Sequence, residues 1–484
     1  MTNFGWTSAI YLLLIVCVVG AASSNAQTFT TLVNFNIVNG SSPYASLVQG
    51  TDGSFYGTTT YGGPTSCESP NGCGTVFRVT PGGTLTTLHK FCRQTNCADG
   101  ANPQGTLVLA VNGNFYGTTS GGGANSGGTI FKITTRGALT TLYSFCAQTN
   151  CADGSSPRSL TLGTDGSLYG TTVFGGADAS CYLCGTVFKM TPSGQLTTLH
   201  SFDGTDGASP RSLIQGSDGN FYGTTYGDDA TNCEETGVNC GTVFKMTPAG
   251  VLTTLHAFSY IDGAGPIGAL VESKTGNFSG TANYGGTVLD VCDVGCGTIF
   301  KVTSTGKFTS LQNFSWGNGS IPFAGLILAT DGNYYGTTSS GAPSGNGNIY
   351  EVGSGRGIDS LYAFEDSYFS IAGLLQATNG TFYGSTAGDG NTSFGTIFSE
   401  NTGLGPFIAF VSPAGSVGKK AQILGQGLTG TTSVTFNGVP ATSFTVVADT
   451  YMTAVVPNGA TTGKVVVTTP SGTLTSNVNF RIIK

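Results

Sequence analysis

A short motif recurs along most of the chain and limits what it can fold into. It consists of an aromatic or aliphatic residue, Tyr, Gly and two Thr, and successive copies lie 48 to 60 residues apart. Repetition at such a period is typical of solenoids, propellers and related repeat architectures. The chain is therefore expected to contain seven similar units, with clear copies at Phe55–Thr59, Phe115–Thr119, Leu168–Thr172 and Phe221–Thr225 and looser copies at Phe278–Ala282, Tyr334–Thr338 and Phe382–Thr386.

Each unit contains four short segments with the pattern of β-strands. In the first unit these are Ser46–Val48, Phe55–Tyr56, Gly74–Val79 and Leu85–His89, and Asp52-Gly53 separates the first two. Apolar and polar residues alternate with period two, and Asp-Gly pairs favour the tight turns of antiparallel hairpins. Four-stranded units repeated around an axis form a β-propeller, so the sequence predicts an all-β fold with seven blades.

The count of fourth strands predicts how the ring closes. The seventh unit ends after Phe398 without a fourth strand, whereas Phe29–Phe35 resembles one and precedes the first unit. We expect this N-terminal segment to lie beside Gly395–Phe398 as the outer strand of the last blade, since closure leaves no exposed sheet edge. The predicted propeller covers residues 27–402, and the fourth strands of the other units begin at Leu85, Leu139, Leu196, Leu252, Phe308 and Ile358.

The two ends of the chain differ from the repeats. Ala9–Val19 is apolar but short for a membrane span, and Ser24-Asn25-Ala26 after it has the small residues of a cleavage site. Residues 1–26 are therefore predicted to be a signal peptide, which places the mature protein outside the cell or at its surface, without a transmembrane segment. From residue 406 to residue 484 the repeat gives way to the pattern of a small antiparallel β-sandwich.

These motifs resemble two known families. The repeated Tyr-Gly-Thr-Thr, together with Gly185–Lys189, Leu196–Leu199 and their copies, resembles the GloVer (Gloeo-Verruco) tandem repeat of bacterial secreted proteins. The C-terminal segment is similar to an IPT/TIG immunoglobulin-like domain, through Ser412-Pro413, Gly425–Leu428, Val434–Val439 and Val455–Pro457. The resemblance implies an extracellular bacterial protein with no established reaction.

The cysteines are grouped in local pairs. One of the 13, Cys17, lies in the predicted signal peptide, and the others form six pairs in the loops between units and between strands. Short spacings in an exported protein favour disulfides within each loop. A zinc site is the alternative for the set, and Cys181 and Cys184 also have the spacing of a redox motif. The expected disulfides are Cys67/Cys73, Cys92/Cys97, Cys146/Cys151, Cys181/Cys184, Cys233/Cys240 and Cys292/Cys296.

The titratable residues offer little material for catalysis. His89, His200 and His256 occupy one repeated position that other units fill with Tyr or Gln, which favours a structural role over a catalytic one. Acidic turns before the first strands are most simply turn chemistry, although a ring of Ca²⁺ ligands or a carboxylate pair for glycoside hydrolysis is the alternative. No metal or cofactor is predicted, and the turn residues are Asn39, Asp99, Asp153, Asp206, Asp262 and Asn318.

Four aromatic residues are the predicted ligand-binding positions. Tyr61, Phe174, Tyr226 and Tyr284 follow the second strands of units with long loops, where aromatic rings either pack or stack on a ligand. A net charge of −7 disfavours nucleic acid as a partner. We expect a secreted or surface-associated binding scaffold that holds a neutral or cationic glycan or a protein. The alternatives are an extracellular hydrolase or lyase acting on polysaccharide and a purely structural envelope or adhesion protein.

Overall fold

The structure is a computed structural model that describes residues 27–63, 71–177, 181, 183–227, 240–287, 292–353, 355–365, 370–388 and 394–483. The predicted signal peptide, residues 1–26, lies outside this part of the chain. Within it the protein is all-β, with strands and short 3-10 helices, and no helix is long and apolar enough to cross a membrane. The 3-10 helices used below are η1 (Thr95–Cys97), η2 (Thr149–Cys151) and η4 (Trp316–Asn318).

The described part of residues 28–401 forms seven four-stranded antiparallel sheets, which we number 1 to 7 in chain order. Sheets 1 to 3 are β2 (Val48–Gln49), β3 (Phe55–Thr59), β4 (Thr75–Val79), β5 (Leu85–Lys90); β6 (Val108–Leu109), β7 (Phe115–Thr119), β8 (Thr129–Ile133), β9 (Leu139–Ser144); and β10 (Ser155–Leu162), β11 (Leu168–Phe174), β12 (Thr186–Met190), β13 (Leu196–Ser201). Sheets 4 and 5 are β14 (Ala208–Gln215), β15 (Phe221–Gly227), β16 (Thr242–Met246), β17 (Leu252–Ala257); and β18 (Val271–Glu272), β19 (Phe278–Ala282), β20 (Thr298–Val302), β21 (Phe308–Asn313). Sheets 6 and 7 are β22 (Ile327–Leu328), β23 (Tyr334–Thr337), β24 (Asn348–Val352), β25 (Ile358–Ala363); and β26 (Leu375–Gln376), β27 (Phe382–Thr386), β28 (Thr396–Asn401), β1 (Thr28–Asn34).

The N-terminal strand completes sheet 7, as the sequence predicts. Strand β1 pairs antiparallel with β28, and Phe29 lies opposite Glu400. Sheet 7 in turn packs against sheet 1, because the rings of Tyr383 and Phe55 have centroids 4.0 Å apart. The first and last sheets are therefore neighbours, and the row of sheets closes on itself.

The aromatic pair of the repeat packs between neighbouring sheets. In most sheets the Tyr of the second strand contacts the Phe of the next sheet, and both are buried. Aromatic pairs of this kind add to the area that each ring removes from water. The pairs are Tyr56–Phe115 at 4.1 Å, Tyr169–Phe221 at 4.1 Å, Tyr222–Phe278 at 3.7 Å and Tyr335–Phe382 at 4.4 Å between ring centroids.

The glycine that starts each third strand is required where neighbouring sheets touch. Gly241 has φ +74°, and a Cβ built there would clash with the carbonyl oxygen of Thr225 in its own sheet and lie 2.9 Å from Cδ of Pro266 in the loop before the next sheet. The residue before that proline, Gly265, donates its N–H to the carbonyl oxygen of Cys240 at 2.9 Å. A side chain at position 241 would be strained and would push against the neighbouring proline, which explains why glycine recurs here.

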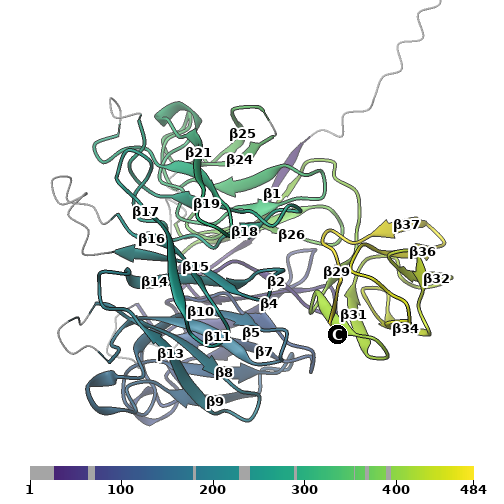
Figure 1. The fold of residues 1–484 in the computed structure, drawn as a ribbon, viewed down its shortest axis with the longest axis horizontal. Helices are drawn as coiled ribbons and strands as arrows, with labels where there is room; N and C mark the ends of the chain where they lie inside the picture. The colour runs from purple at the N-terminus through teal and green to yellow at the C-terminus, as the bar shows by residue number, and fades with distance from the viewer. Residues whose placement is uncertain are drawn as a thin grey trace, which may run out of the picture.

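The C-terminal residues form a second body of strands, labelled β29 to β37 in Figure 1. Ile423, Phe436, Met452 and Val467 are fully buried in its core. Its sheets are β29 (Ala409–Phe410), β31 (Lys420–Leu424), β35 (Tyr451–Val455), β34 (Phe444–Ala448); β33 (Val439–Pro440), β32 (Ser433–Phe436), β36 (Val465–Thr469), β37 (Gly472–Thr475); and the parallel pair β30 (Ala414–Ser416) and β38 (Arg481–Ile483).

Candidate functional site

The first strand of each sheet is its inner strand. The inner strands converge, and a cavity of about 880 Å³ lies at their C-terminal ends. Residues of β2, β6, β10, β14, β18 and β22 line it, so six sheets surround one central channel. We call this end of the channel the turn-side mouth, because the hairpin turns between first and second strands lie there. The opposite end, where the loops carrying the cysteines lie, is the loop-side mouth.

The C-terminal body covers the turn-side mouth. Arg481 donates a hydrogen bond to the carbonyl oxygen of Ser217 at 2.6 Å, and Gln422 donates to that of Val111 at 2.7 Å. Thr450 donates to the carbonyl oxygen of Thr51 at 2.8 Å, and Phe410 and Leu424 line the cavity wall. A large ligand therefore meets the second body before it reaches the channel from this end.

The acidic turns at the covered mouth are satisfied within their own sheets. Asp218 accepts hydrogen bonds from the hydroxyl of Tyr222 at 2.8 Å and from Asn220, and Lys245 lies 3.2 Å away. Burial raises the pKa of Asp218, but these donors more than offset it, so the pKa lies below its ordinary value. Asp52, Asp165 and Asp331 make the corresponding bond to Tyr56, Tyr169 and Tyr335.

The acidic residues of the loops before the first strands are held by side chains on the last strand of the preceding sheet. His89 lies 3.0 Å from the buried carboxylate of Asp99, and the pairs His200–Asp206 and His256–Asp262 lie at 2.7 and 2.9 Å. In sheet 2 the hydroxyl of Tyr143 replaces the imidazole and donates to Asp153 at 2.8 Å. This replacement fits a structural role for the histidines. It also means that these carboxylates bind protein donors rather than facing one another as a ring.

Four of the six predicted disulfides are present as predicted, each within its own loop. They join Cys92 to Cys97, Cys146 to Cys151, Cys181 to Cys184 and Cys292 to Cys296. Cys73 and Cys240 are also disulfide-bonded, whereas Cys67 and Cys233 lie outside the described residues.

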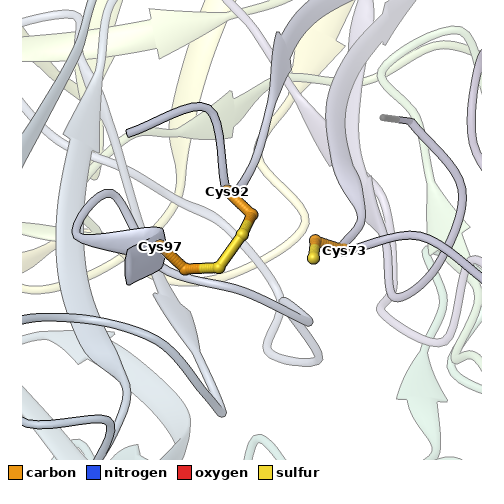
Figure 2. A group of neighbouring side chains, drawn as sticks. All are labelled: Cys73, Cys92 and Cys97. Carbon is orange, nitrogen blue, oxygen red and sulfur yellow. A yellow bond between two sulfur atoms is a disulfide. The ribbon is translucent and has the colours of Figure 1, made fainter. Parts of the chain in front are cut away.

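Three of these cysteines meet near η1. The sulfur atoms of Cys73, Cys92 and Cys97 lie within 4.8 Å of one another, and Figure 2 shows the Cys92–Cys97 bond beside Cys73. A metal would need thiolates, but all three sulfurs are oxidised in disulfides. Disulfide bonding therefore accounts for the closeness of the three sulfur atoms without a metal.

The strand register corrects one part of the aromatic prediction. Tyr61, Phe174 and Tyr284 lie opposite the equivalent residues Ser41, Ser155 and Ala264 of their first strands. Tyr226 lies one residue earlier, because in sheet 4 Gly227 is the residue that faces Ala208. Successive side chains of a strand point to opposite faces, so the four aromatics do not share one position.

Tyr226 and Tyr284 nevertheless come together at the loop-side mouth. Both side chains are half-buried, and they flank Gly265. A Cβ built at Gly265 would lie 3.1 Å from Cε2 of Tyr226 and 3.4 Å from Cδ2 of Tyr284. Glycine is therefore required for the close approach of the two rings, because a side chain here would press against both. Phe174 is half-buried as well, and Tyr61 packs edge-on against Tyr44 with centroids 6.4 Å apart.

Two arginines that sequence reasoning missed join this group. The guanidinium carbon of Arg211 lies 5.1 Å from the ring centroid of Tyr226. Burial lowers the pKa of Arg158 to about 10, with Arg211 lowering it further and Tyr61 acting in the opposite direction. Charges from sheets 1, 3 and 4 therefore act on one another across the mouth.

A repeated position could have revealed these arginines. In sheets 1 to 6 a proline precedes the inner strand, and the residue after it is half-buried at the loop-side mouth. We call this set, with its counterpart in sheet 7, the loop-side rim: Tyr44, Gln104, Arg158, Arg211, Ile267, Phe323 and Ile371. Comparison of the residues after each proline shows two adjacent units with Arg, which is uncommon in a chain with 9% charged residues.

The chain belongs to a repeat family. The family described as the Gloeobacter/Verrucomicrobia repeat matches residues 63–290 and 238–446, which together cover most of the chain. This confirms the resemblance of the repeats. No curated protein matches the chain.

Solved structures are similar in fold. The extracellular domain of the two-component system protein BT4673 from B. thetaiotaomicron has 13% identity and a TM-score of 0.50, with 84% of this chain and 45% of that chain covered. Virginiamycin B lyase from Staphylococcus aureus has 13% identity and a TM-score of 0.49, with 78% and 98% covered. At 13% identity the likeness to the BT4673 domain shows the fold alone, which is all-β and propeller-like.

Proposed function

We propose that this chain is an extracellular binding protein whose ligand, a glycan or a protein surface, docks at the loop-side mouth. The observation that carries the proposal is the contrast between the two mouths. The repeated carboxylates of the turns and loops, such as Asp218 and Asp262, are bound by side chains of nearby strands, and the turn-side mouth is covered. At the loop-side mouth aromatic rings and two guanidinium groups meet on a rigid ring of sheets.

The proposal includes a finer reading of the fold and its location. The seven sheets are the blades of one propeller, residues 406–484 are an immunoglobulin-like domain of the IPT/TIG type, and residues 1–26 direct export. The four described disulfides support an oxidising compartment such as the cell exterior.

Tyr226 and Tyr284 are the proposed central contacts. Their rings flank Gly265 with too little room for a methyl group between them, so a sugar face or a flat side chain would pack across the two rings rather than between them. Stacking of this kind uses rigid side chains that lose little conformational entropy on binding. Tyr61 and Phe174 are proposed as outer contacts on either side.

The test is a binding screen on the mature protein, with glycan and protein ligands and with detection of released products. Tyr226→Ala with Tyr284→Ala should weaken the binding of an identified ligand by about ten-fold or more, since two aromatic contacts are lost. The matched variant with Phe at both positions keeps the rings and should bind nearly as well. A ligand that binds the double alanine variant normally would place the site elsewhere, and release of oligosaccharide would instead show an enzyme.

A further inference from the structure

We propose that Arg158 and Arg211 form an anion subsite in the loop-side mouth, which takes a carboxylate group of an acidic glycan. This inference rests on the proposed binding function and names the chemical class of the ligand. It replaces the expectation of a neutral or cationic ligand, because the loop-side rim carries two positive charges.

The backbone beneath the two arginines differs from that of the other sheets. Strands β10 and β14 are eight residues long, whereas β2, β6, β18, β22 and β26 have two residues each. The longer strands extend to the loop-side end, where Pro157 lies opposite Thr172 and Pro210 lies opposite Thr225. In both, the regular pairing is interrupted directly after the proline, before Leu160 in β10 and before Ser212 in β14. Arg158 and Arg211 therefore lie at matching interruptions of the pairing in two adjacent sheets.

The two guanidinium groups have no anionic partner among the described residues. None of the ion pairs between described residues includes them, and the buried Nε atom of each lacks a hydrogen-bond partner. Burial is the largest cause that lowers the pKa of each arginine, and Arg158 and Arg211 repel each other. Like charges in a partly dehydrated site are unfavourable until an anion neutralises them.

This pair stands out against the charge of the whole chain. The net charge is −7, yet among the described residues the charged or titratable groups that act on Arg158 are Arg211 and Tyr61, and the one that acts on Arg211 is Tyr226. In contrast, Arg78 at the covered mouth lies 2.8 Å from Asp52. The loop-side pair is thus the exception that a bound anion would explain.

The neighbouring groups favour a carboxylate carried by a sugar. A guanidinium presents two parallel N–H donors that match the two oxygens of a carboxylate. The Tyr226 ring lies beside Arg211 and the Tyr284 ring lies on the other side of Gly265, so a sugar ring attached to the carboxylate has a surface to stack on. A uronic acid combines both features in one residue.

The experiment compares acidic oligosaccharides with their neutral counterparts on the full mature chain. The probes are oligogalacturonate, oligoguluronate and hyaluronan oligosaccharides, the carboxyl-reduced form of each, and a sulfated galactan oligosaccharide, all measured by titration calorimetry at low and high salt. We expect at least one uronate to bind about ten-fold or more tightly than its reduced form, and the difference to shrink at high salt.

Arginine variants then assign the preference to the subsite. Arg158→Gln with Arg211→Gln should abolish it, and Lys at both positions should restore part of it because charge returns without the planar fork. Arg136→Gln with Arg356→Gln removes the same charge from exposed turns and should change nothing. Near-native melting of all variants keeps the comparison valid.

Three results would overturn the inference. The first is that no uronate binds better than its reduced form. The second is a preference that survives in the Arg158/Arg211 glutamine variant. The third is tighter binding of the sulfated probe than of every uronate, which would make sulfate the ligand group. If neutral oligosaccharides bind as tightly as the uronates and the Tyr226/Tyr284 alanine variant loses them, the binding function stands while the anion subsite falls.

Discussion

The two mouths of the channel are built from the same repeat but treat polar groups differently. At the turn-side mouth Asp218 is bound by Tyr222 and Lys245, and the second body covers the centre. At the loop-side mouth Arg158 and Arg211 lack such partners among the described residues. Polar residues of the repeat that bond to one another stabilise the ring. The two arginines depart from the repeat and have no such hydrogen-bond or ion-pair partner, so we expect a ligand there.

The largest expected effect comes from opening the ring, on which both mouths depend. Deletion of residues 27–36 removes β1 and the buried side chains of Val33 and Phe35, and exposes the edge of β28. The loss of these two side chains alone is expected to cost about 5 kcal/mol or more. Thermal unfolding and size-exclusion chromatography should show a large drop in stability or aggregation. Unchanged melting would mean that β1 is not needed for closure.

The next largest loss of stability is expected for a glycine at the loop side, which we compare with a glycine at the turn side. Gly241→Ala should destabilise by about 3 kcal/mol, because the backbone is strained and the new methyl group clashes with the carbonyl oxygen of Thr225 and contacts Pro266. Gly219→Ala, with φ +87° but no heavy atom within 4 Å of the new Cβ, should cost only about 1 kcal/mol. Denaturant unfolding of the two variants measures the difference, and equal losses would argue against close packing around Gly241.

Glu400 is an exception at the turn-side end. Its side chain is fully buried, neither carboxylate oxygen has a hydrogen bond, and the other six sheets have Val, Ile or Met at this position. Burial raises the pKa of Glu400, and the nearby Gln27 amide offsets only part of this. Glu400→Val should therefore stabilise the protein by about 1–3 kcal/mol at neutral pH.

The pH dependence of this gain follows from the raised pKa of Glu400. A carboxyl group whose folded pKa exceeds its unfolded value binds more protons in the folded state, so native stability falls as pH rises between the two values. The advantage of Glu400→Val should be present above the folded pKa and disappear below the ordinary Glu pKa. Melting curves of both proteins across this range provide the measurement, and a gain that does not change with pH would show that ionisation of Glu400 is not its cause.

The smallest changes in stability are expected when charged side chains are removed from either mouth. Asp218→Ala should lower stability by about 1 kcal/mol, a modest loss because the carboxylate is partly exposed. Arg158→Gln with Arg211→Gln should leave stability unchanged or slightly higher, since repulsion is removed and no described ion pair is lost. Chemical denaturation of both variants, with the wild type as reference, checks the signs. Destabilisation by the arginine variant would indicate a structural role for the pair.

The sequence by itself determined the local and repeated features of this protein. The alternating strands, their hairpin turns, the spare N-terminal strand and the short-range disulfides all follow from patterns within a few tens of residues, where backbone preference and spacing decide the outcome. The seventh unit has only three strands of its own, so the sequence predicted that Phe29–Phe35 supplies the fourth. The structure pairs this segment, as β1, with β28.

Only the tertiary structure decided which residues meet at the two mouths. Arg158 and Arg211 belong to different sheets, and their closeness to Tyr61 and Tyr226 depends on how the sheets pack around the channel. The meeting of Tyr226 and Tyr284 beside Gly265 depends on how sheets 4 and 5 pack, and the covered mouth depends on where the C-terminal body docks. Local patterns constrain the backbone of one strand at a time, whereas these contacts arise from the curvature of the whole ring, which no single segment encodes.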